Sequence, residues 1–413
     1  MVDQEIGLLI GAGASFELGM PLVSHLTGEF KGYFTSAHLR QLNARWRQQG
    51  GGCDDSVIEL IIDLLNRHDL HYENILGCLQ TMARRHDQPS AEQYWDMYAR
   101  MVELVYLLLY YRQSRILPYI RRGFPPFEGL EGFVKQQSNP IWIFSLNHDS
   151  MIEILAQHCN IPLRDGFWPD KTMTIRANHH NEKCVLQADL LSEDDLGRAN
   201  LHLFRTREPG INLIKIHGAL DVFATRDGRD LCRLRAVGKE LSGRLVALEI
   251  LNERIGFWQN GYKIRAVNEI AYADESGEMQ FLRRTLLAGA QKFKERFPQT
   301  LPQRMLDLFR SYLNFVHHLY VLGYSFGDTH IDLELRNWLE FAHGRSMVII
   351  DPNLHRLPTQ FAHLAPQIEI LRKTASQFFA DYRSIPMTPI QRLEQKVRAA
   401  LRPFFEKRAA RKR

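Results

Sequence analysis

Five short apolar runs, each ending in or followed by a glycine or a polar residue, constrain the fold of this chain more than any other feature. They occupy residues 6–10, 140–145, 213–216, 318–323 and 346–351. The runs are rich in β-branched and aromatic residues and show no clear alternation, which is typical of strands buried on both faces of a parallel sheet. Amphipathic segments separate them. The pattern therefore predicts an α/β fold with a doubly wound, Rossmann-like parallel sheet.

The segments between the runs predict helices and one hairpin. Helices are expected after the capping residues Asp54, Asp55 and Ser56, and over 93–113, 301–315, 331–341 and 391–405. Residues 263–271 and 278–283, separated by a polar turn, indicate a β-hairpin. We expect a single domain with a core of 1–23, 137–163, 213–221 and 301–385. A helical insertion of 24–136, a mixed insertion of 164–212 and 222–300, and a C-terminal helix with a basic tail, 386–413, complete it.

Composition excludes several classes of protein. The chain is 45% hydrophobic and 24% charged, which is typical of a globular protein. Its five cysteines form no CxxC pair, which argues against a disulfide framework and a four-cysteine zinc site. The start lacks the features of a signal peptide, and the longest apolar stretch, 102–111, is too short to cross a bilayer. We therefore expect a soluble, cytoplasmic protein without membrane contact.

Charge is concentrated at the C-terminus. The net charge is +5, and residues 407–413 carry five cations and no acid, so the remainder of the chain is neutral. A short basic tail is either a solvated helix end or a contact to DNA or a partner protein.

The turn Gly11-Ala12-Gly13-Ala14-Ser15 follows a predicted strand and opens a predicted helix. Such a turn lets the backbone approach a pyrophosphate, and free N–H groups at the helix start bind the anion. Because position 16 is Phe and no acidic residue ends a second strand about 20 residues on, a nicotinamide redox domain is disfavoured. A tight turn without a ligand remains the alternative.

Three further motifs follow the other predicted strands. They are FSLNHD at 144–149, KIHGA at 215–219 and GYSFGD at 323–328. Together with the first glycine turn and Gly19-Met20-Pro21, this order resembles the sirtuin superfamily. More closely, it resembles the sirtuin-like NAD hydrolases of bacterial anti-phage defence, and the chain length resembles that of the sirtuin-like subunit paired with a HerA-type hexameric ATPase.

The resemblance implies a sirtuin-type sheet and specific roles for its motif residues. Asn147 and His217 correspond to the catalytic pair. NAD-binding roles are implied for Gly11, Ala12, Gly13, Ser15, Asp149, Gly323, Ser325 and Asp351. The four-cysteine zinc ribbon of sirtuin deacylases is absent, and Pro21 is followed by Leu-Val-Ser-His rather than an Arg-bearing loop. The resemblance therefore implies hydrolysis of NAD to nicotinamide and ADP-ribose, depleting NAD in abortive infection, with NAD as substrate and no metal.

The chemistry of this pair fits that reaction. Nicotinamide leaves as a neutral molecule, so the protein needs to stabilise an oxocarbenium-like ribose and deliver water. An Asn amide oxygen can hold water or a ribose hydroxyl, and a neutral His can accept the proton. Asp351 would accept from both ribose hydroxyls and repel a 2′-phosphate, which predicts preference for NAD over NADP. Because free hydrolysis would poison a cell, we expect a homo-oligomer or a partner, with 24–136 as the candidate for self-assembly.

Two other functions stay open. The fold could bind NAD or ADP-ribose without catalysis, as a sensor or scaffold. The sequence around Ser325 also matches the G-x-S-x-G motif of serine hydrolases, with Asp351 and His355 or His363 following in the required order. Two histidine groups with metal-ligand spacing, His68 with His71 and His179-His180 with Cys184, lack a matching second pair and are interpreted as surface residues.

Overall fold

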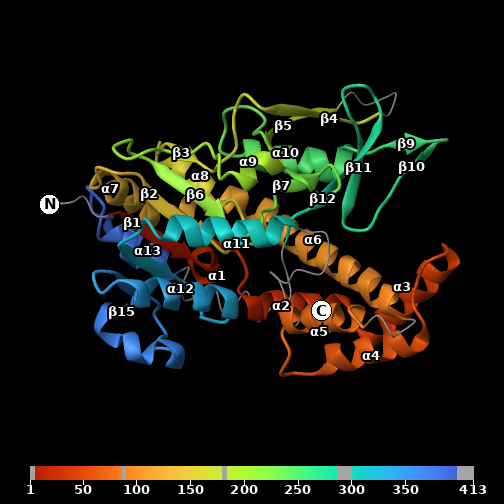
Figure 1. The fold of residues 1–413 in the computed structure, drawn as a ribbon, viewed down its shortest axis with the longest axis horizontal. Helices are drawn as coiled ribbons and strands as arrows, with labels where there is room; N and C mark the ends of the chain where they lie inside the picture. Colours follow the sequence, from red (N-terminus) through yellow and green to blue (C-terminus); the bar gives the residue numbers. More distant parts are fainter. Residues whose placement is uncertain (1–4, 86–89, 179–183, 287–299, 398–413) are drawn as a thin grey trace.

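The computed structural model describes residues 5–85, 90–178, 184–286 and 300–397, and its centre is a seven-stranded parallel sheet (Figure 1). The strands are β1 (Ile6–Ile10), β2 (Ile141–Ser145), β3 (Leu163–Arg164), β6 (Ile211–Lys215), β13 (His318–Leu322), β14 (Ser346–Ile350) and β15 (Ile368–Leu371). Their order is β15-β14-β13-β1-β2-β6-β3, and every neighbouring pair is parallel. The predicted α/β fold class and the five predicted strands are confirmed.

The strand order creates a crevice at β1. The chain continues from β1 to β2 on one side, whereas β13 lies on the other side of β1. Loops after these strands therefore leave the carboxyl end of the sheet in opposite directions, and ligands of doubly wound folds bind at that reversal.

A helical region follows the first strand. It contains α1 (Ala12–Phe16), α2 (Val23–Tyr33), α3 (Ser36–Gln48), α4 (Asp55–Asn66), α5 (Tyr72–Ala83) and α6 (Ala91–Gly123). The helix expected after Asp54 is α4, and Asp54 is its N-cap residue. The helix expected over 93–113 is α6, which extends ten residues further, to Gly123. In Figure 1, α6 runs between the other helices and the β-strands of the upper right.

The remaining helices belong to the sheet and its connections. They are α7 (Gly129–Lys135), α8 (Met151–His158), α9 (Glu193–Gly197), α10 (Gly243–Glu249), α11 (Thr300–Leu313), α12 (Thr329–Phe341) and α13 (Ala375–Ala380), with short 3-10 turns at Pro125–Glu128 and Thr359–Gln367 and a π turn at Ile250–Arg254. The predicted helices over 301–315 and 331–341 correspond to α11 and α12. Helix 389–397 is the described part of the one expected over 391–405, and the basic tail, 407–413, lies outside the described residues.

A closed antiparallel barrel of six strands is the second β unit. Its order is β11-β12-β7-β8-β5-β4. The strands are β4 (Thr172–Arg176), β5 (Val185–Leu191), β7 (Val222–Thr225), β8 (Asp230–Leu234), β11 (Glu269–Ala273) and β12 (Met279–Arg284). The predicted hairpin is present, but its first strand begins at Glu269. The expected start at Lys263 is wrong because Lys263 pairs with Trp258 in a separate ribbon, β9 (Trp258–Gln259) and β10 (Tyr262–Lys263).

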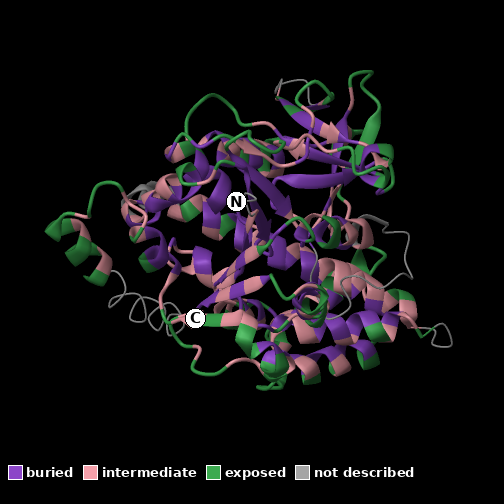
Figure 2. Ribbon diagram, turned by 60° about the vertical axis from the view of Figure 1, so that its left-hand side comes forward, coloured by how far each residue is buried: buried purple, intermediate pink, exposed green. Residues whose placement is uncertain are grey.

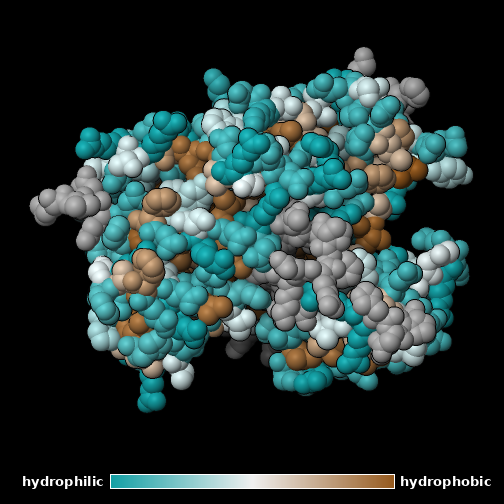
Figure 3. Space-filling view, viewed as in Figure 1, coloured by the Kyte–Doolittle hydropathy of each residue, from teal (hydrophilic) through white to brown (hydrophobic). Residues whose placement is uncertain are grey.

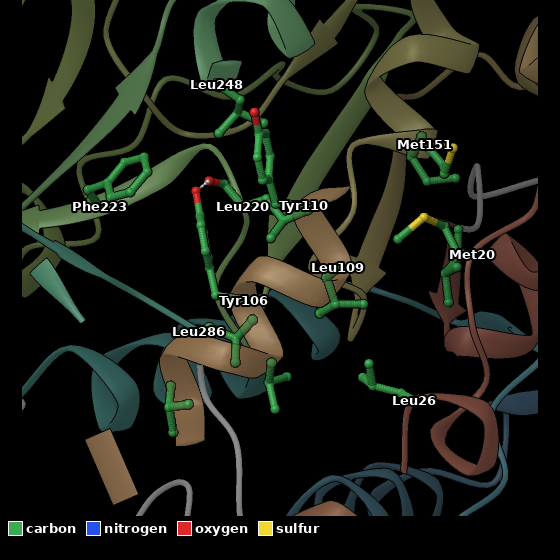
Figure 4. Packing of buried hydrophobic residues seen from close by; sticks show 14 of the residues in the cluster. Met20, Leu26, Tyr106, Leu109, Tyr110, Met151, Leu220, Phe223, Leu248 and Leu286 are labelled. Atoms are coloured by element: carbon green, nitrogen blue, oxygen red, sulfur yellow. Dashed lines mark hydrogen bonds between the residues drawn. The ribbon is translucent and has the colours of Figure 1, made fainter. Parts of the chain in front are cut away.

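The core is continuous from the sheet into the helical region and the barrel. Figure 2 shows buried residues along the strands and the inner faces of the helices, and exposed residues at loops and outer faces. Tyr106 of α6 joins the parts directly: its hydroxyl donates to the backbone oxygen of Leu220 (3.1 Å), and its ring contacts Phe223 of β7 (Figure 4). The helical region is thereby fixed to the segment that follows β6.

The surface viewed in Figure 3 is mostly hydrophilic, with hydrophobic side chains in small separate patches. Among the described helices, none combines the length and the apolar character that crossing a bilayer requires.

Candidate active site at the carboxyl end of the sheet

Two glycine turns are packed against each other at the crevice between β1 and β13. The Gly11 N–H donates to Leu322 O and the Gly13 N–H donates to Gly323 O, both at 2.9 Å. A Cβ on Gly11 would lie 2.6 Å from Gly323 O, and one on Gly323, whose φ is +62°, would lie 2.3 Å from Ala14 N. The backbones therefore meet at a distance that only glycine permits.

This contact corrects one expectation about the turn. The N–H groups of Gly11, Gly13 and Ala14 all donate to backbone oxygens of the protein, so they are not free for an anion. Ala12 is the first residue of α1, a position at which the N–H has no acceptor within the helix. The glycines serve the contact between the two turns, and Ala12 is one position from which the turn can donate to a ligand.

Asn147, Ser15 and Asp149 form a buried chain of hydrogen bonds. The Asn147 Nδ2 group donates to Gly11 O and to Ser15 Oγ, both at 2.9 Å, and Ser15 Oγ donates to Asp149 Oδ1 at 3.1 Å. Asn147 thus uses its amide protons within the protein, and its Oδ1 is the polar atom left for a ligand or water. Burial raises the pKa of the Asp149 carboxyl above its usual value, and nearby Lys215 partly opposes this shift.

Lys215, the last residue of β6, holds the loop after β2 against the loop after β6. Its Nζ donates to the backbone oxygens of Asn147 (3.3 Å) and Asp149, and lies 3.3 Å from Glu153 Oε1 on α8. The Leu220 N–H also donates to His148 O at 2.9 Å. These contacts place the segment carrying His217 directly beside the segment carrying Asn147.

His217 is 5% exposed and faces a carboxylate from the opposite side of the crevice. Its Nε2 lies 3.3 Å from Asp328 Oδ2, an ion-pair distance. The other oxygen of Asp328 caps α12 by accepting from His330 N at 3.1 Å, so the carboxylate is fixed where it meets the imidazole. In the sequence, Asp328 is the last residue of the GYSFGD motif and is assigned no role of its own in the site. Its position after a predicted strand of the same sheet was the signal that it lies at the site.

The remaining predicted residues lie at the same edge of the sheet. Asp351 follows β14 and is half-buried, and its Oδ1 accepts from Asn353 N at 2.7 Å. Ser325 lies exposed on the turn after β13. The structure thus brings Gly11, Gly13, Ser15, Asn147, Asp149 and Gly323 into direct contact. It places His217 next to this group through Lys215. Ser325 and Asp351 share the edge, but neither is hydrogen-bonded to the group within the described part of the chain.

The serine-hydrolase alternative lacks its geometry. In a nucleophile elbow the serine itself occupies the strained turn position. Here the residue with φ of +55° is Phe326. His363 pairs with Glu340 at 2.8 Å, His355 is exposed, and within the described residues no histidine is hydrogen-bonded to Ser325.

The predicted surface histidines give no metal site in the described part of the chain. No group of three or more His, Cys, Asp or Glu residues lies close enough there to hold an ion. His68 is exposed and His71 caps α5, whereas His179 and His180 lie outside the described residues.

Comparisons with known proteins add three distant structural likenesses. No family profile matches the chain, and no curated protein matches it. A Sir2 homologue with a serine-to-alanine substitution, bound to ADP-ribose, is 12% identical, covers 92% of this chain and 90% of its own, and has a TM-score of 0.38. A Sir2 homologue with a phenylalanine-to-alanine substitution, bound to ADP-ribose, is 13% identical, covers 92% of this chain and 90% of its own, and has a TM-score of 0.38. A complex of a Sir2 homologue with NAD is 13% identical, covers 92% of this chain and 87% of its own, and has a TM-score of 0.37. At this level the fold assignment rests on the observed strand order rather than on these likenesses.

Proposed function

We propose that this chain is a NAD glycohydrolase that cleaves NAD to nicotinamide and ADP-ribose. The observation that carries the proposal is the joining of four strand-end motifs at one edge of the sheet. There the Asn147–Ser15–Asp149 chain of hydrogen bonds and the His217–Asp328 pair flank the contact between the two glycine turns.

The reaction divides into steps that these residues can perform. The bond between the ribose C1′ and the nicotinamide nitrogen breaks, and its electron pair stays on the ring, which leaves neutral. Water adds to C1′, and His217 accepts the proton that the water releases. Asn147 Oδ1 holds the water or a ribose hydroxyl, because its amide protons are used by Gly11 and Ser15. Buried dipoles and carboxylates stabilise the positive charge of the ribose.

The same edge provides positions for the rest of NAD. Ala12 N–H can donate to the pyrophosphate, and Gly323 with Ser325 forms the second turn beside it. Asp351, at the end of β14, is the carboxylate for the adenosine ribose, which favours NAD over NADP. The cellular role that the sequence resemblance supports is depletion of NAD in anti-phage defence. A homo-oligomer, a HerA-type ATPase partner and DNA contact by the basic tail belong to the same proposal.

Product analysis tests the activity directly. The purified chain incubated with NAD should release nicotinamide and ADP-ribose in equal amounts, resolved by chromatography. Asn147→Ala and His217→Ala should each lower turnover by about 10²–10⁴-fold, the range for loss of a general base. His363→Ala, an exposed histidine outside the site, is the matched control and should retain activity. Near-normal turnover in either site variant would remove that residue from the mechanism.

The binding-only alternative predicts a different result. Saturable binding of ADP-ribose by calorimetry, with no nicotinamide released alone or with the candidate partners, would identify the chain as a sensor or scaffold.

A further inference from the structure

A cavity of about 110 Å³ lies behind the segment that carries His217. Residues 215, 216, 218, 219, 221 and 222 form one wall, and the barrel, α6 and α11 form the others. The cavity is therefore separated from the glycine turns by the chain between β6 and β7, and none of the residues assigned above to NAD lines it.

The body of the cavity is apolar. Its walls include Phe167, Leu191, Leu196, Val222, Leu231 and Leu308, which belong to one cluster of buried hydrophobic residues. An apolar cavity of ~150 Å³ is large enough to hold benzene. At about 110 Å³, this cavity limits the part of a ligand that it encloses to about one small ring or branched chain.

Its polar end consists of charges that already have partners. The pairs are Lys215–Glu153 (3.3 Å), Arg244–Asp221 (3.0 Å), Arg284–Glu103 (3.0 Å) and Arg233–Asp165. A charged ligand would bring an additional buried charge without a counter-ion, which is costly. The ligand that fits is electrically neutral.

Three polar atoms at this end have no hydrogen-bond partner among the described residues. They are Glu153 Oε2, Arg233 Nε and Arg284 Nε. The side chains of Glu153 and Arg284 are only 4% and 6% exposed. A buried polar atom without a partner is unfavourable, so these atoms favour a ligand with one donor for the carboxylate and one acceptor for a guanidinium.

We propose that this cavity binds a small neutral molecule with an apolar body and an amide-type end. An amide group supplies both a donor, for Glu153 Oε2, and an acceptor, for an arginine Nε. Because Glu153 pairs with Lys215, and Lys215 holds the backbone oxygens of Asn147 and Asp149, occupancy of the cavity alters the support of the candidate active site. This regulatory consequence rests on the proposed function, whereas the binding itself does not.

Benzamide is the test probe, with benzoate and benzylamine as ring-matched charged controls. A ligand of this size binds with Kd of about 1 mM. Benzamide should raise the melting temperature of the full chain, and the two charged analogues should bind at least tenfold more weakly. Saturating ADP-ribose should leave benzamide binding unchanged, and benzamide should change the rate of NAD turnover.

Variants locate the binding. Leu308→Trp and Ala224→Leu fill the cavity from α11 and β7 and should each abolish the benzamide effect, whereas Leu333→Trp, on the exposed side of α12, should retain it. Absence of benzamide binding, equal binding of benzoate, or binding that survives in the folded filled variants would overturn the proposal. Benzamide binding in a chain that releases no nicotinamide would refute the glycohydrolase and leave the cavity site standing.

Discussion

His217 and Asp328 meet across the crevice from two loops. The effect of the Asp328 carboxylate on the His217 imidazole can be tested separately from its effect as the N-cap of α12. Asn caps a helix about as well as Asp. Asp328→Asn should therefore keep α12 intact while removing the negative charge that faces the imidazole. We expect kcat for NAD to fall by about 10-fold or more with little change in KM, because ordering of the base matters in the transition state.

Steady-state kinetics of Asp328→Asn beside Asp332→Asn checks this prediction. Asp332 lies on the same helix and accepts from Tyr324, so it controls for loss of a local carboxylate. Equal turnover in the wild type and Asp328→Asn would show that Asp328 only caps the helix.

Asp149 is a second residue whose negative charge should measurably lower the stability of the folded protein. Burial raises the pKa of its carboxyl above the ordinary value of 3.8. As pH rises from below 3.8 through the raised pKa, the unfolded chain loses this proton more readily than the folded protein does, so the free energy of unfolding falls. Asp149→Asn should melt at a higher temperature than the wild type at about pH 8, and the difference should shrink toward about pH 4. Calorimetric melting at both pH values measures it, and a variant less stable than wild type at the higher pH contradicts the sign.

At the scale of the structural elements, the turn between β13 and α12 requires glycine at position 323 and has space for a larger residue at position 327. Gly323→Ala places a Cβ 2.3 Å from Ala14 N at a φ of +62°, whereas a Cβ on Gly327 meets only Ser325 Oγ at 3.8 Å. We expect Gly323→Ala to lower the free energy of unfolding by about 2 kcal/mol or more, and Gly327→Ala to change it by less than about 0.5 kcal/mol. Urea titration of both variants is the measurement, and equal stability would refute the tight contact.

Five of the seven strands of the sheet could be predicted because each is a short apolar run with most of its residues buried. β3, which has only two residues, and β15, which is only partly buried, were not predicted. The barrel could not be predicted as a whole. Its strands β7 and β8 are only four and five residues long. On their outer sides β7 pairs with β12 and β8 pairs with β5, strands that lie in other parts of the sequence. The site shows the same limit: the motifs indicate which loops meet, but the pairing of His217 with Asp328 depends on how β6 and β13 are placed across β1 and β2.

At the scale of the whole molecule, α6 connects the helical region to the chain that carries His217. Tyr106→Phe removes the hydroxyl that donates to Leu220 O and accepts from Asn252 Nδ2 (3.2 Å). We expect a loss of about 1–2 kcal/mol in the free energy of unfolding, with lower NAD turnover, because a buried carbonyl loses its donor. Tyr111→Phe, on the same helix and 48% exposed, should leave both unchanged. Thermal melts and turnover assays of the two variants decide the matter.

The closure of the barrel has a consequence for how this chain can assemble. All six barrel strands have neighbours on both sides, which limits the rows of unpaired amides and carbonyls open to another polypeptide. The shortest junction is between β11 and β4, which pair only at Ala273 and Arg176. The parallel sheet ends in β3, of two residues, and β15, of four, which leaves little backbone for an added strand. Within the described residues, recruitment by edge pairing is therefore disfavoured, and we expect any higher-order complex to be held mainly by side chains on helices and loops.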